Sequence, residues 1–147
     1  MDKSAILRKV RELLESNINE LNRSLDAQQS ASDMDEGDTL DPEDYSQQSE
    51  SRDKVMALQI QLDAAHAQLN KLDDFANRKS NGAETGALIE TDKNLFYMGI
   101  SFSPMKIDGK ELYGVSPDSP AFNSIKGKSI GDTFRIGNGD HTIQHIY

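Results

Sequence analysis

Two narrow stripes of apolar residues constrain the fold of this chain more than any other feature. The first stripe is Leu7, Leu14, Ile18, Leu21 and Leu25, with Arg11 and Gln28 as polar exceptions. The second is Val55, Leu58, Leu62, Ala65, Leu69, Leu72 and Ala76. Spacings of three, four and seven are typical of helices that bury one seam. Because each stripe can hide only against another, we predict helices over residues 5–30 and 45–76, paired as an antiparallel coiled-coil hairpin.

Composition and charge limit the remaining possibilities. The 147 residues are 35% hydrophobic and 6% aromatic, which is lean for one large core, so we expect two modules. The net charge of −9 argues against direct binding to nucleic acid, which needs clustered Lys and Arg. The chain has no cysteine and no apolar run that approaches the roughly 18 residues of a membrane span. We therefore expect a cytoplasmic protein without a membrane partner.

Seven carboxylates lie between the two predicted helices. They are Asp33, Asp35, Glu36, Asp38, Asp41, Glu43 and Asp44, and residues 27–51 contain no Lys or Arg. Gly37 and Pro42 favour a turn here, and Pro42 also suits the first turn of the returning helix. Carboxylates that repel one another at the end of a helical hairpin indicate a site that meets a cation.

Three other interpretations of this acidic segment stay open. Asp41, Glu43 and Asp44 suit the dipole of the second helix and could serve as capping groups alone. A solvated acidic loop is the usual fate of a charge run. An EF-hand calcium loop that began at Asp33 would place Gly37 at its fifth position instead of the sixth, so that match is poor.

The second half of the chain predicts a small, mainly β domain. The domain boundaries that we expect are 1–78 for the hairpin, 79–86 for a linker and 87–147 for the β domain. Strand-like runs cover 87–90, 95–102, 111–115, 132–136 and 141–146. The last two flank Gly137-Asn138-Gly139-Asp140, which predicts a hairpin. Residues 120–125 predict one or two turns of helix.

Two strands carry more detailed expectations. In the run 95–102, Phe96, Met98, Ile100 and Phe102 share one face, with Leu95 and Tyr97 on the other, so we expect a half-buried strand. In the last strand Ile143 and Ile146 have opposite parity. Either a bulge lies between them or both faces are covered.

Several motifs resemble the Gre family of bacterial transcript-cleavage factors. The tip Gly37-Asp38-Thr39-Leu40-Asp41, followed by Asp44-Tyr45, is similar to the acidic tip of that family's coiled coil. The family's Ser-Pro loop, short helix and Gly-Lys turn are matched by Val115-Ser116-Pro117-Asp118-Ser119-Pro120-Ala121 and by Gly127-Lys128-Ser129-Ile130-Gly131-Asp132. The resemblance covers essentially the whole chain, and the C-terminal motif is its more specific half.

The resemblance implies an α+β fold with a coiled-coil hairpin and an FKBP-like C-terminal domain. It implies a monomeric accessory factor that enters the secondary channel of bacterial RNA polymerase and meets nascent RNA only through the polymerase. Asp38 and Asp41 would correspond to the two acids that help the polymerase hold a shared Mg²⁺ for hydrolysis of backtracked RNA. Glu36, Glu43 and Asp44 would add supporting charge, and Tyr45 would pack at the tip. No cofactor would bind the factor alone.

The chain differs from the family's motif at two positions, and two alternative functions stay open. The family has Glu then Asn where this chain has Asp41 then Pro42, so the second carboxylate is shorter and its backbone is stiffer. A channel-binding inhibitor without cleavage activity is therefore the closest alternative.

An FKBP-type prolyl isomerase is a further alternative, but the chain lacks Trp. The aromatics Phe96, Phe102, Tyr113, Phe122 and Phe134 are better interpreted as core. We expect His66 at the surface and His141 and His145 in structural or surface roles.

Overall fold

The chain has a mixed α+β fold in which two N-terminal helices precede a six-stranded sheet. The computed structural model describes the backbone of residues 1–33 and 42–147, and the side chains of residues 1–30 and 49–147. The helices are α1 (Lys3–Asp33), α2 (Pro42–Phe75) and α3 (Pro120–Ile125). The strands are β1 (Leu88–Thr91), β2 (Leu95–Met98), β3 (Met105–Ile107), β4 (Lys110–Val115), β5 (Thr133–Ile136) and β6 (Gly139–Ile146). The two long helices predicted from the apolar stripes are confirmed.

The chain divides into two compact units. Residues Leu13–Ala67 form the helical unit, and Met1–Glu12 together with Gln68–Tyr147 form the sheet unit. Each long helix therefore contributes residues to both units. The connection from α2 to β1, residues 76–87, contains the predicted linker 79–86 and belongs to the sheet unit.

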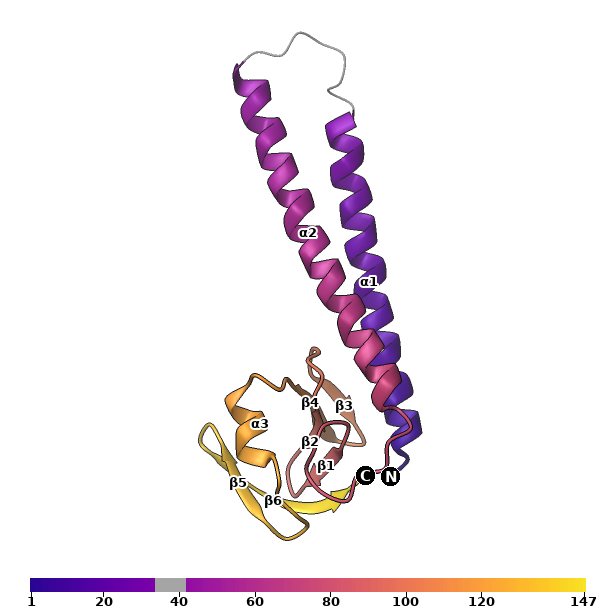
Figure 1. Cartoon of the computed structure of the whole chain (residues 1–147), viewed down its shortest axis with the longest axis vertical. Helices are drawn as coiled ribbons and strands as arrows, with labels where there is room; N and C mark the ends of the chain where they lie inside the picture. The colour runs from indigo at the N-terminus through magenta and orange to yellow at the C-terminus, as the bar shows by residue number, and fades with distance from the viewer. Residues whose placement is uncertain (34–41) are drawn as a thin grey trace. The chain divides into compact units, whose positions relative to one another are not determined.

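The helical unit buries its apolar side chains along the predicted seam. Within it α1 and α2 run side by side in opposite directions (Figure 1). The buried seam residues of this unit are Leu14, Ile18, Leu25, Leu62 and Ala65. Val55 and Leu58 are half-buried, whereas Met56 and Ile60 on another side of α2 are 64% and 66% exposed. One seam per helix is buried because only one neighbouring helix is available to cover it.

In the sheet unit, the first turns of α1 bury a wider stripe. Ile6, Leu7 and Val10 are all at most 6% exposed. Lys3 extends its ammonium group to three backbone carbonyls, donating to Arg78 O at 3.0 Å, Gly86 O at 2.9 Å and Tyr147 O at 3.0 Å. The start of α1 is thereby fixed to the connection and to the end of the chain.

The sheet order is β3-β4-β2-β1-β6-β5. β2 pairs antiparallel with β1 and parallel with β4, so it is an interior strand. All four of its residues are buried, including Leu95 and Tyr97. The prediction of a half-buried strand was wrong, because both faces of β2 are covered and alternation in sequence then has no solvent face to mark. The strand also ends at Met98, and Gly99 follows with a φ of 103°.

The C-terminal hairpin forms where the sequence predicted it, and its second strand also pairs with β1. β5 and β6 pair antiparallel from Thr133↔Thr142 to Ile136↔Gly139, which confirms the predicted hairpin. In the pairing of β6 with β1, the register shifts between Glu90↔His145 and Thr91↔Ile143. Of the two alternatives that the sequence left open, this irregularity favours the bulge, and it accounts for the opposite parity of Ile143 and Ile146.

Two short elements complete the sheet unit. Strand β3, which the sequence analysis missed, pairs antiparallel with β4 across a turn at Asp108 and Gly109. Helix α3 confirms the prediction for residues 120–125 and starts with Pro120. Its N-cap Ser119 accepts a hydrogen bond from the Phe122 N–H at 3.2 Å and donates one to Ser116 O at 2.7 Å. These bonds explain why so short a helix forms at this position.

Candidate functional site

The acidic segment connects the two long helices, but its central part lies outside the described residues. α1 ends at Asp33 and α2 begins at Pro42. The predicted pair Asp38 and Asp41 and the supporting Glu36 fall between these ends, in residues 34–41, which lie outside the described residues. Along the chain, these residues follow the end of α1 and precede the start of α2.

Glu43, Asp44 and Tyr45 lie in the first turns of α2. Their backbone is helical, and Pro42 is the first residue of the helix, as its missing N–H allows. Their side chains lie outside the described residues. Carboxylates at this end of a helix interact favourably with its dipole, so Glu43 and Asp44 have a structural role open to them besides any function.

The aromatic residues of the sheet unit mostly form core. Phe96, Phe122 and Phe134 are at most 7% exposed, which confirms the prediction for these three. Phe102 and Tyr113 are only half-buried. The centroid of the Phe96 ring lies 5.7 Å from that of Tyr113 and 5.6 Å from that of Phe134. Such contacts between rings are typical of aromatic residues that pack in a core.

The three histidines have the roles expected from the sequence. His66 is exposed on α2. His141 is buried, and its ring is stacked on that of Phe134 with the centroids 5.3 Å apart. Burial, followed by the nearby charge of Lys93, lowers the pKa of His141. His145 is exposed and its Nδ1 lies 3.1 Å from a carboxylate oxygen of Glu90.

Glu90 is the centre of a polar cluster that the sequence analysis missed. Its carboxylate accepts from Lys110 Nζ at 3.1 Å and from the Tyr147 hydroxyl at 3.1 Å, besides facing His145. Burial raises the pKa of Glu90, but these hydrogen bonds and charges together outweigh it and lower the pKa below its usual value. The partners come from β4, β6 and the last residue, so no spacing along the chain indicates the cluster.

A pocket of about 750 Å³ lies in the sheet unit between the connection and α3. The residues that line it are Arg78, Lys79, Glu84, Thr85, Pro117, Phe122, Asn123 and Lys126. Its two walls are joined by backbone hydrogen bonds, because Ala83 N donates to Lys128 O at 3.1 Å and Gly127 N donates to Ala83 O at 2.8 Å. The pocket is thus built into the fold of this unit.

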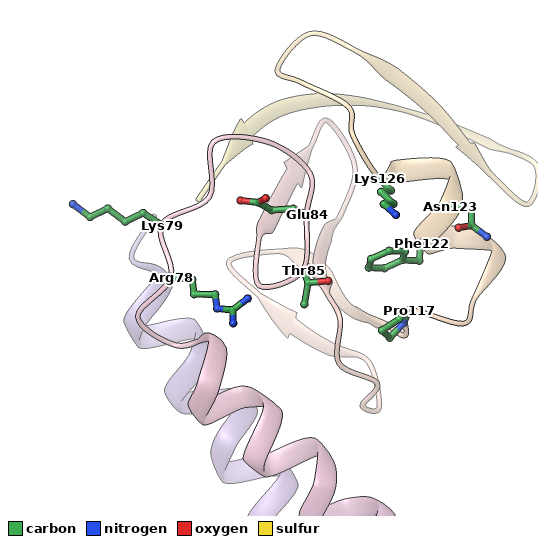
Figure 2. Close-up of a pocket in the computed structure, with 8 residues that line it drawn as sticks. All are labelled: Arg78, Lys79, Glu84, Thr85, Pro117, Phe122, Asn123 and Lys126. Atoms are coloured by element: carbon green, nitrogen blue, oxygen red, sulfur yellow. The ribbon is translucent and has the colours of Figure 1, made fainter.

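The cationic side chains of the pocket approach it from both walls. In Figure 2, Arg78 extends from the connection toward the pocket, and Lys126 lies beside Phe122 on the opposite wall. Thr85 lies between them, whereas Lys79 points away. The Arg78 guanidinium lies over the Phe75 ring, 5.0 Å from its centroid. The sequence analysis missed this site because its two cations are separated by 47 intervening positions.

Two buried hydroxyls of the described residues have no hydrogen-bond partner. They belong to Tyr97, which is 0% exposed, and to Ser80. Burial raises the pKa of Tyr97 to about 12, against the opposing effect of the Arg78 charge. A buried phenol that lacks a partner stays neutral at physiological pH, so Tyr97 acts as an apolar residue of the sheet.

The described part of the chain contains no group of three or more His, Asp or Glu side chains placed to hold a metal ion. Over the same residues, no helix is both long enough and apolar enough to cross a membrane. Comparisons of the chain with protein-family models, with curated proteins and with solved structures gave no match.

Proposed function

We propose that this protein is a Gre-like transcription factor that binds bacterial RNA polymerase through its secondary channel. In this proposal α1 and α2 form an antiparallel coiled coil that enters the channel, and the sheet unit is an FKBP-like domain that docks at the channel mouth. The factor acts as a monomer in the cytoplasm and has no catalytic centre of its own. It meets nascent RNA only through the polymerase.

One observation carries the proposal. Seven carboxylates lie between Asp33, the last residue of α1, and Asp44, in the first turn of α2; the two antiparallel helices have 31 and 34 residues and measure about 46 and 51 Å at 1.5 Å per residue. Such helices are long enough to bring acidic groups deep into a channel of another protein. The short helix α3 with its Ser119 cap, followed by the Gly-Lys turn and the β5–β6 hairpin, is consistent with the C-terminal half of the resemblance.

Asp38 and Asp41 would hold a Mg²⁺ ion shared with the polymerase. Carboxylate oxygens are hard ligands of the kind that Mg²⁺ prefers, so the donor set fits this ion. The bound ion would acidify water and offset charge on the scissile phosphate during hydrolysis of backtracked RNA. The contribution of this chain is to supply carboxylates and to position them.

A channel-binding inhibitor is the second candidate, favoured by one observation. α2 begins at Pro42, directly after Asp41. A residue that precedes proline has a restricted backbone, and Asp is one methylene shorter than Glu. If Asp41 fails to reach the ion, the factor would occupy the channel without stimulating cleavage.

The experiment is transcript cleavage on a stalled, backtracked complex with the cognate polymerase. We expect the wild-type chain to stimulate cleavage, and Asp38→Asn and Asp41→Asn each to reduce the rate by about 10²-fold or more while binding to polymerase is retained, because each removes one charged ligand. Glu50→Gln, at an exposed position of α2, is the matched control.

The outcomes separate the candidates. Polymerase binding without stimulation, with competition against another channel-binding factor, would favour the inhibitor. A chain that neither binds the polymerase nor changes cleavage would overturn both forms of the proposal. Proline-isomerase activity above background would favour the enzyme alternative instead.

A further inference from the structure

The pocket between the connection and α3 concentrates positive charge in an acidic chain. Three of its eight lining residues carry cations, of which Arg78 and Lys126 reach toward the pocket and Lys79 points away, and one carries a carboxylate, whereas the whole chain has a net charge of −9. Cations gathered around a hollow repel one another, and an anion bound between them removes this repulsion. We propose that this pocket binds a small molecule that carries a phosphoryl group.

The donors that face the pocket suit a phosphoryl group. Arg78 offers the planar N–H fork of a guanidinium, Lys126 offers an ammonium group and Thr85 offers a hydroxyl. Figure 2 shows Arg78 and Lys126 reaching toward the pocket from opposite walls, with Thr85 between them. A phosphoryl group presents three acceptor oxygens and can accept from several such donors at once. The carboxylate of Glu84 points away from Phe122 and α3 in the same view.

Both cations are available to a ligand. Among the residues that the structure describes, neither Arg78 nor Lys126 takes part in a salt bridge. Arg78 is in contact with the face of the Phe75 ring. A guanidinium that rests on an aromatic face keeps its N–H groups, which lie at its edge, free to donate.

Hydrogen bonds fix the backbone positions from which Arg78 and Lys126 extend. Arg78 O accepts a hydrogen bond from Lys3 Nζ at 3.0 Å, and Arg78 N donates to Phe75 O at 3.0 Å. Lys126 N donates to Phe122 O at 2.8 Å at the end of α3. A site whose backbone is already fixed loses less conformational entropy when it binds.

The remaining lining residues would suit an organic group attached to the phosphoryl group. Pro117 and the Phe122 ring supply apolar surface beside the cations. A volume of about 750 Å³ lies within the range of small-molecule sites, roughly 300–1,000 Å³. A peptide bound as an added strand or as a helix would need a groove along a strand edge or a helix face, whereas this pocket is lined by eight residues from the connection and from the segment around α3. These features favour a phosphorylated small molecule over a peptide.

The test is an NMR titration of the full-length ¹⁵N-labelled chain with inorganic phosphate and with pyrophosphate at constant ionic strength. We expect saturable shifts of the Thr85, Asn123 and Lys126 amides, with pyrophosphate binding more tightly because it carries more charge. Arg78→Gln and Lys126→Gln should each weaken binding by about tenfold or more, as the loss of a charge-assisted hydrogen bond implies. Arg78→Lys should weaken it less than Arg78→Gln.

Matched controls remove the same charges elsewhere. Lys106→Gln on β3 and Arg135→Gln on β5 alter exposed residues outside the pocket and should leave the affinity within about twofold. Shifts that do not saturate, or that fall equally in the controls, would overturn the proposal. Tighter binding of an acidic peptide than of pyrophosphate at the same amides would overturn it in favour of a protein partner. The titration contains no polymerase, so its result is independent of the proposed transcriptional function.

Discussion

The helical unit and the sheet unit bury their apolar residues in different ways. In the helical unit each helix has one neighbour, and large side chains such as Met56 and Ile60 remain more than 60% exposed. In the sheet unit β2 has a neighbouring strand on each side, and all of its residues are buried. The difference indicates that most of the stability from side-chain burial resides in the sheet unit, because buried apolar area sets that contribution.

Truncation of one aliphatic residue in each unit gives the largest expected contrast. Ile89→Ala, in the core of the sheet unit, should lower the free energy of unfolding by about 4 kcal/mol, because Ile89 is 0% exposed and leaves a cavity. Leu58→Ala, at a half-buried seam position of the helical unit, should cost below about 1.5 kcal/mol. Chemical denaturation followed by circular dichroism measures both. Equal losses would contradict the contrast between the units.

A comparison of alanine substitutions at two glycines tests how tightly the sheet unit is packed around its pocket. At Gly99, where φ is 103°, an added Cβ would come within 2.8 Å of Thr85 Cγ2. We expect Gly99→Ala to cost about 3 kcal/mol, from the positive φ and the clash together. Gly109→Ala is the control, because φ there is 84° and an added Cβ meets nothing within 4 Å.

The difference between the two glycine variants, measured by thermal or chemical unfolding, isolates the clash. We expect Gly109→Ala to cost only about 1–2 kcal/mol. If Gly99→Ala cost no more than Gly109→Ala, Thr85 would be free to move, and the wall of the pocket would be less rigid than the structure indicates.

The smallest expected effect concerns the pH dependence of the polar cluster. Glu90→Gln should destabilise the protein by about 1–2 kcal/mol at pH 7, because its charged hydrogen bonds are weakened. The pKa of Glu90 in the folded protein is lowered from 4.5, so the unfolded chain takes up the proton first as the pH falls. The stabilising contribution is therefore present above pH 4.5 and is lost as the pH falls through the lower pKa of the folded state.

Denaturation curves of wild type and Glu90→Gln at several pH values measure this effect, and the two proteins should converge at acidic pH. Glu20→Gln on the exposed surface of α1 is the control, with an expected change within about 0.5 kcal/mol at every pH. A difference between wild type and Glu90→Gln that persisted unchanged into acid would rule out the carboxylate charge as its source.

The sequence was informative wherever a short stretch determined the outcome. The seam positions of both helices, the helix start at Pro42, the capped helix at 120–125 and the β5–β6 hairpin all depend on neighbours a few residues apart. The half-buried assignment of β2 failed because burial of its second face depends on distant segments of the chain. Strand β3 was missed because three residues carry too little periodicity to predict a strand.

The candidate sites also differ in whether a short stretch of sequence could reveal them. The acidic segment is contiguous, so the sequence alone located Asp38 and Asp41 between two helices. The pocket and the Glu90 cluster combine residues from distant elements, such as Arg78 with Lys126 and Glu90 with Lys110. No local pattern predicts such pairs.

By itself the sequence determined where the helices lie, where the acidic residues fall between them and that a β domain follows. Helical periodicity, proline and glycine signals and charge runs act over a few residues, so they can be read along the chain. Only the tertiary structure decided the strand order, the parallel pairing of β2 with β4 and the attachment of Lys3 to three distant carbonyls. These depend on contacts between residues far apart in sequence, which form only when the whole unit packs.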